Sequence, residues 1–211
     1  MRRLLFAGLS ANTMVLMLAA ASMLILKRGC GVSDTNALLF SFVQFAASAL
    51  FSFVCGKIAG KVGPRKVIIG VCIAELMIPV LWILAPQEGI AMRIFAFAAF
   101  AVLGAASISL SNSQAHYFLQ SVPAGSRVVG SMLSAMIMSV LAGIAGMLLA
   151  GFILGHIVTG SPETAMMEYK TYFMIVFFIS IPGVLLQLWL KPLPIELRKP
   201  IARGIPRENH K

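Results

Sequence analysis

The chain has 211 residues, of which 59% are hydrophobic and 11% are charged, and its mean hydropathy is +0.93. Soluble domains average about 45–50% apolar and about 25% charged residues, so this composition excludes a water-soluble globule. The 17 Lys and Arg residues against 7 Asp and Glu give a formal net charge of +10. Such a charge attracts phosphate, but its distribution among the loops argues against a nucleic-acid partner.

Six uninterrupted apolar stretches predict six membrane-spanning helices. They cover residues 4–26, 37–55, 67–85, 94–110, 128–158 and 172–190. A helix needs about 20 apolar residues to cross a bilayer, whereas a barrel strand needs about 9–11, so these lengths favour helices. The fifth stretch is too short for two crossings and predicts one tilted helix. We therefore expect an all-α, polytopic membrane protein with a six-helix transmembrane bundle over residues 1–190.

The basic residues predict the orientation of the chain. Lys27, Arg28, Arg93 and Lys170 fall in the loops of one side, and the other 13 of the 17 basic residues fall on the opposite side. Because cytoplasmic loops carry the excess of Lys and Arg, both termini are expected in the cytoplasm, in a bacterial plasma (inner) membrane. Residues 191–211 are rich in proline and basic residues and predict a disordered cytoplasmic tail. Trp82 and Trp189 lie near predicted helix ends, where tryptophan commonly sits at the membrane interface.

Polar side chains recur at helical spacing within the first, second and fourth stretches. Residues three and four apart share a helix face, so these stripes predict surfaces turned away from lipid. The candidate substrate-cavity residues are Asn12, Thr13, Gln44, Ser48, Ser107, Ser111 and Asn112. Small and hydroxylated residues also let helices approach and hydrogen-bond, so helix packing is the competing interpretation. The amides of Asn12 and Gln44 favour a functional role, because an amide in hydrocarbon needs several partners.

Glu75 is the only acidic residue within a predicted span, nine residues after Lys66 and so near the middle of the membrane. An ionised carboxylate at that depth is costly unless it is paired, and protonation removes the cost. Glu75 is therefore a candidate for proton coupling. The alternative is a protonated side chain that hydrogen-bonds a neighbouring helix for structural reasons only.

The sequence contains few of the motifs that are typical of enzymes. It contains no HExxH or GxSxG motif, and its three histidines lie at or beyond the predicted helix ends. The three cysteines lack the spacing of metal ligands. We expect no enzymatic activity, no metal and no cofactor.

The loop between the second and third predicted helices resembles the motif of a known protein family. It reads Gly56-Lys57-Ile58-Ala59-Gly60-Lys61-Val62-Gly63-Pro64-Arg65-Lys66. This sequence resembles the cytoplasmic signature of the major facilitator superfamily, a glycine followed by Asp-Arg-x-Gly-Arg-Arg, which follows the second helix of each six-helix half. The residues that match in kind are Gly56, Lys61, Gly63, Arg65 and Lys66. Gly60 replaces the acidic residue, and such a degenerate copy is more typical of the carboxy-terminal half.

A second motif, Pro123-Ala124-Gly125-Ser126-Arg127, is similar to the Pro-x-x-x-Arg connection of that family. The resemblance implies one six-helix half of a secondary transporter, a symporter or antiporter that works by alternating access. It implies a substrate site on the first, second, fourth and fifth helices, with Lys61, Arg65 and Lys66 in a cytoplasmic gate.

The partners implied by the resemblance are a small-molecule substrate, a coupled proton or sodium ion, the lipid bilayer and a second six-helix half. That half would come from the same gene upstream or from a second copy in a homodimer. The alternative function is a non-transporting six-helix scaffold or partner subunit, in which the polar stripes only hold helices together.

Overall fold

The computed structural model describes residues 2–122, 124–159, 161 and 164–191. Within them the chain is helical and contains no strand, which confirms the all-α prediction. The elements are α1 (Arg2–Leu24), a π-helical turn η1 (Ile25–Gly29), α2 (Asp34–Val62), α3 (Pro64–Glu75), α4 (Met77–Leu84), α5 (Gly89–Ser121), a 3₁₀ turn η2 (Ala124–Ser126), α6 (Arg127–Ile157) and α7 (Ala165–Leu188). Six helical units in this part of the chain are long and apolar enough to cross a membrane, as in an integral membrane protein.

The third unit is divided into α3 and α4 at Leu76. Pro79 explains the division, because proline has no N–H to donate to the carbonyl of Glu75, four residues earlier, and its ring crowds that carbonyl. The backbone N–H of Leu76 bonds instead to the carbonyl oxygen of Ile73, 3.2 Å away, which tightens the turn.

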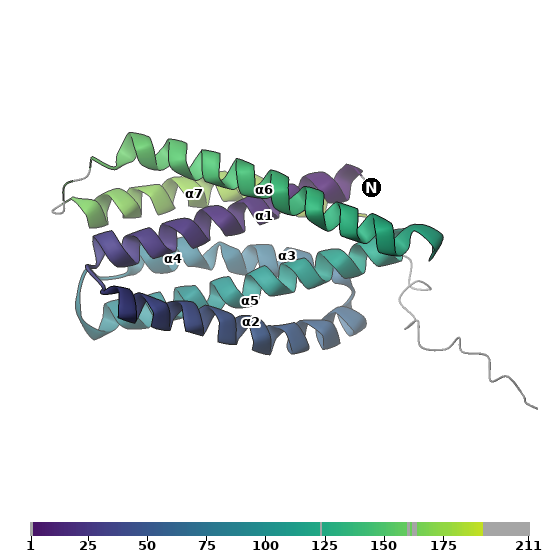
Figure 1. The fold of residues 1–211 in the computed structure, drawn as a ribbon, viewed down its shortest axis with the longest axis horizontal. Helices are drawn as coiled ribbons and strands as arrows, with labels where there is room; N and C mark the ends of the chain where they lie inside the picture. Colours follow the sequence, from purple (N-terminus) through teal and green to yellow (C-terminus); the bar gives the residue numbers. More distant parts are fainter. Residues whose placement is uncertain (1, 123, 160, 162–163, 192–211) are drawn as a thin grey trace, which may run out of the picture.

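The helices form two layers (Figure 1). The nearer layer runs in the order α2, α5, α1, α6, and the more distant layer contains α3, α4 and α7. The main contacts join α5 to α2, α3 and α4, and join α1 to α6 and α7. The flanking helices α2 and α6 expose most of their apolar side chains, as helices in contact with lipid would.

An aromatic cluster joins four helices in the core. The ring of Trp82 on α4 stacks against Phe173 on α7, with ring centroids 5.9 Å apart, and meets Phe100 on α5 edge-on at 6.3 Å. Its indole N–H donates to Ser22 Oγ on α1 over 2.9 Å. Trp82 is therefore buried inside the bundle instead of presenting its ring to the membrane interface, whereas Trp189 is half exposed.

The beginning of α1 lies next to the end of α7. The guanidinium of Arg3 lies 4.7 Å from the ring centroid of Trp189, and Tyr117 OH donates to the carbonyl oxygen of Lys191 over 2.8 Å. An even number of spans requires this arrangement. The tail predicted for residues 191–211 lies outside the described residues apart from Lys191.

Candidate functional site

The predicted cavity residues occupy two separate places. The first is a seam between α2 and α5, where Gly104 lets the helices touch. A Cβ on Gly104 would lie 2.0 Å from the carbonyl oxygen of Gln44, closer than real Cβ contacts. The hydroxyl of Ser48 lies 2.9 Å from the carbonyl oxygens of both Gln44 and Gly104 and can donate to either. We call this contact the α2–α5 seam.

Further polar bonds extend the seam along both helices. Asn112 Nδ2 donates to Ser52 Oγ over 3.2 Å, and Cys55 Sγ lies 3.4 Å from Ser113 Oγ. Ser107 bonds within α5, donating to the carbonyl oxygen of Gly104 over 3.1 Å. Four predicted cavity residues thus lie at or beside the seam, and helix packing accounts for the bonds made there. They are Gln44, Ser48, Ser107 and Asn112.

The second place is a pocket between α1, α5 and α6, with a volume of about 100 Å³. Its polar lining consists of Asn12, Ser111, Gln114, Ser131, Ser134 and Ser139, and we call it the amide pocket. Asn12 Nδ2 donates to Gln114 Oε1 over 3.0 Å and to the carbonyl oxygen of Gly8 over 2.7 Å. Two of the predicted residues, Asn12 of α1 and Ser111 of α5, are therefore brought together beside the amide of Gln114, which is also on α5.

Gln114 is the central side chain of the amide pocket. It is 8% exposed, and its Nε2 finds no hydrogen-bond partner among the described residues. Gly8 makes room beside it, since a Cβ there would lie 2.7 Å from Met138 Sδ and 3.5 Å from Gln114 Nε2. Buried polar groups are nearly always hydrogen-bonded, so an unpartnered amide donor in a pocket marks a place for a ligand or a water molecule.

Thr13 lies away from the amide pocket although it follows Asn12 directly. Successive residues of a helix are about 100° apart around its axis. Thr13 lines a separate apolar groove with Met14 of α1 and with residues of α6 and α7, including Leu149 and Ile179. The structure therefore places it on another face of α1.

Sequence reasoning missed the contribution of α6. Ser131 and Ser134 are three residues apart within an otherwise apolar stretch, and they line the amide pocket with Ser139. That spacing was the available signal, because residues three apart share a face. Gly8 gave no comparable signal, since its role depends on the approach of Met138 from a distant part of the chain.

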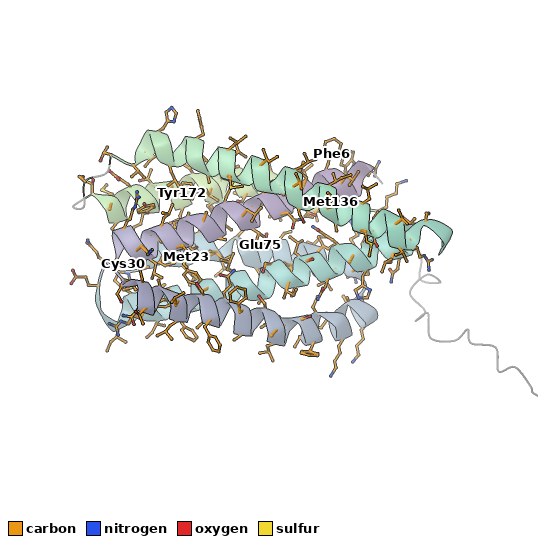
Figure 2. The ribbon with its side chains drawn as sticks, in the orientation of Figure 1. Phe6, Met23, Cys30, Glu75, Met136 and Tyr172 are labelled. Carbon is orange, nitrogen blue, oxygen red and sulfur yellow. The ribbon has the colours of Figure 1, made fainter. Side chains whose placement is uncertain are left out.

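Glu75 stands apart from both places. It lies near the middle of the bundle's length (Figure 2) and is completely buried. Neither carboxyl oxygen has a hydrogen-bond partner in the part of the chain that the structure describes. It continues the buried stripe of Ile68 and Cys72 on α3, which is followed by Ile78 and Trp82 on α4.

The predicted gate residues surround the turn between α2 and α3. Gly63 has a φ of 95°, which glycine adopts without strain. Arg65 Nη2 donates to the carbonyl oxygen of Leu188 at the end of α7 over 2.9 Å, where a cation also complements the helix dipole. Lys61 and Lys66 are exposed, as is Gly56. Arg65 therefore holds two helices of this bundle together at the end where α1 begins and α7 ends.

The resemblance to the major facilitator superfamily rests only on the two sequence motifs. No family model matches the chain, and neither a curated protein nor a solved structure matches it. Membership of the major facilitator superfamily remains a prediction. The site rests on the geometry of the amide pocket, and among the described residues no group of three His, Cys, Asp or Glu could hold a metal ion.

Proposed function

We propose that the chain is one six-helix half of a secondary transporter of the major facilitator type, which moves a small neutral solute by alternating access. The observation that carries this proposal is the amide pocket. It is formed by the first, fourth and fifth spanning units, three of the four that the family resemblance implies. Its buried, unpartnered amide donor gives a solute something to bind.

The lining of the amide pocket favours an uncharged substrate. Among the described residues its polar groups are amides and hydroxyls, and none of the lining residues is Lys, Arg, Asp or Glu. Such groups recognise hydroxyl and carbonyl oxygens, as in sugars, and would leave a full charge without a counter-ion. We therefore assign the substrate to neutral polar solutes.

The size of the pocket favours a second half. A volume of about 100 Å³ is well below the roughly 300–1,000 Å³ of typical small-molecule sites. A facing bundle would close the pocket and enlarge it. The partner is a six-helix half encoded upstream in the same gene or supplied by a second copy of this chain, related by an axis along the membrane normal.

Glu75 is assigned to proton coupling. A proton is the one ligand that a fully buried carboxyl group without hydrogen-bond partners can exchange without a larger cavity. Glu75→Gln should abolish uptake driven by a pH gradient and leave solute binding in place. Coupling that survives this substitution would reject the assignment.

The proposed orientation places both termini in the cytoplasm of a bacterial plasma membrane. It is supported by the meeting of Arg3, Arg65 and the end of α7 at one end of the bundle. A membrane-impermeant amine reagent added to intact cells should modify Lys27 and spare Lys61. The reverse pattern would place the Lys61 loop and both termini outside the cytoplasm and contradict the proposed orientation.

The experiment on transport uses the full chain in proteoliposomes, with and without its partner half. A panel of radiolabelled neutral sugars is tested for uptake, and Gln114→Leu should lower uptake of a transported solute at least tenfold. Ser107→Ala is the matched control, because its hydroxyl bonds within α5 and does not line the pocket. Equal uptake by both variants would remove the amide pocket from the transport path.

A scaffold without transport is the second candidate, and the α2–α5 seam favours it. The bonds of Ser48 and Asn112 explain two of the seven predicted cavity residues as helix contacts. If no solute in the panel is taken up by the paired halves, and Gln114→Leu changes only the stability of the fold, the scaffold is the better description.

A further inference from the structure

A groove with a volume of about 720 Å³ lies at the end of the bundle opposite Arg65 and Leu188. It is formed where α2 and α5 both begin, next to the connection that contains Cys30, which Figure 2 shows at that end. Its lining shares no residue with the amide pocket. We call it the loop-end groove.

The loop-end groove changes from polar to apolar along the bundle. Asn36 lies in the first turn of α2, and Phe40 and Val43 follow at about 6 and 10 Å along the helix at 1.5 Å per residue. On α5, Arg93 precedes Phe97 in the same direction. Because α2 and α5 both start at this end, the polar residues lie at the level of the loops and the apolar residues lie deeper in the membrane.

Two opposite charges line the polar end of the loop-end groove. Glu88 and Arg93 are both exposed and both belong to its lining. They make no ion pair with each other, whereas the neighbouring Lys27 and Asp34 do, with 2.6 Å between Nζ and Oδ1. An acidic and a basic side chain that face one groove unpaired complement a ligand with one positive and one negative group.

The apolar part of the groove is exposed on the outer surface of the described bundle. Leu39 is 61% exposed and Phe97 is 54% exposed, although both line the groove. A small polar solute would leave this part uncovered. An acyl chain would cover it and lie parallel to α2 and α5, as the chains of a bilayer lipid do.

From this arrangement we propose that the loop-end groove binds one phosphatidylethanolamine molecule of the bilayer. Arg93 binds the phosphate, Glu88 accepts hydrogen bonds from the ammonium group, and an acyl chain lies along Phe40, Val43 and Phe97. The carboxylate of Glu88 makes the headgroup specific, because phosphatidylcholine has no ammonium N–H to donate and phosphatidylglycerol has no positive charge.

The test is native mass spectrometry of the purified full chain, titrated in detergent with dioleoyl phosphatidylethanolamine, phosphatidylcholine or phosphatidylglycerol. One phosphatidylethanolamine per chain should be retained about tenfold more tightly than the other two lipids, as charge-assisted hydrogen bonds provide. Arg93→Gln should weaken all three lipids about tenfold. Glu88→Gln should remove only the preference for phosphatidylethanolamine.

Arg28→Gln is the matched control, because Arg28 is an exposed basic residue at the same end that does not line the groove. It should leave all three affinities unchanged, and circular dichroism checks that every variant keeps its helices. Equal retention of the three lipids by the native chain, or equal losses in Arg28→Gln and Arg93→Gln, would overturn the proposal.

Cys30 provides a second readout that does not depend on mass spectrometry. It lines the loop-end groove, whereas Cys55 and Cys72 are buried in the helices. Bound phosphatidylethanolamine should slow alkylation of Cys30 by N-ethylmaleimide several-fold, and Arg93→Gln should abolish this protection. A rate of alkylation that is the same with and without phosphatidylethanolamine would contradict a lipid in this groove.

Discussion

The close contact of α2 and α5 predicts an unusually costly Gly104→Ala substitution. The new Cβ would lie 2.0 Å from the carbonyl oxygen and 2.8 Å from the carbonyl carbon of Gln44, both of which are backbone atoms. Ordinary contact starts at 3.4 Å, so the helices must separate by about an ångström or more. The separation would also stretch the 2.9 Å bond from Ser48 Oγ to the carbonyl oxygen of Gly104.

The size of the effect follows from these two losses. Overpacking costs about 1–3 kcal/mol, and an interhelical hydrogen bond in a membrane protein contributes about 0.6 kcal/mol. Alanine regains roughly 0.5–1 kcal/mol over glycine within a helix. The free energy of unfolding of Gly104→Ala should therefore fall by about 1–3 kcal/mol.

Unfolding by sodium dodecyl sulfate in mixed micelles, followed by circular dichroism, measures this change. Gly143→Ala and Gly151→Ala on α6 are matched controls, because a Cβ at either position would meet no atom within 4 Å. They should leave the protein as stable or raise its stability by up to about 1 kcal/mol. If Gly104→Ala behaves like these controls, α2 and α5 do not touch as described, and the α2–α5 seam is wrong.

Three further predictions concern single side chains. Arg65→Gln should increase hydrogen–deuterium exchange at the end of α7, whereas Lys66→Gln, which removes an exposed charge, should leave that exchange unchanged. Ser22→Ala leaves the buried indole N–H of Trp82 without its partner and should lower the free energy of unfolding by about 1–3 kcal/mol in the same micelles, whereas an unchanged value would remove this bond from the core. Burial raises the pKa of Cys30 to about 11, and only the thiolate reacts, so its alkylation rate should rise about tenfold per pH unit from pH 7 to 10; a plateau near pH 9 would contradict the burial.

The sequence predicts the number of spanning helices because apolar length alone decides it. The sequence predicts helix ends less well where a helix extends beyond its apolar stretch and its polar residues contact other helices. The fourth apolar stretch ends at Leu110, yet α5 continues to Ser121, because Asn112 and Ser113 contact α2 and Gln114 contacts α1. Hydropathy reads such residues as a loop, and only the neighbouring helices show that they lie within a bundle.

Spacing in the sequence predicts which candidate residues share a helix face, but not which residues of other helices lie next to them. Ser107 and Ser111 share a face of α5 by their spacing, yet Ser107 bonds to Gly104 within the helix and Ser111 lines the amide pocket. The pairing of Asn12 with Gln114 joins residues 102 positions apart. Periodicity cannot choose such partners, because the choice depends on how α1 crosses α5.

The most direct test of the account is the access of water to the amide pocket. Ser111 is replaced by cysteine in a chain without its native cysteines, and native membranes are treated with a charged, membrane-impermeant thiosulfonate. Ser111→Cys should react, whereas Leu148→Cys, which is exposed on the apolar outer surface of α6, should not. Equal resistance of both positions would show that the pocket is dry and would contradict its role as a transport site.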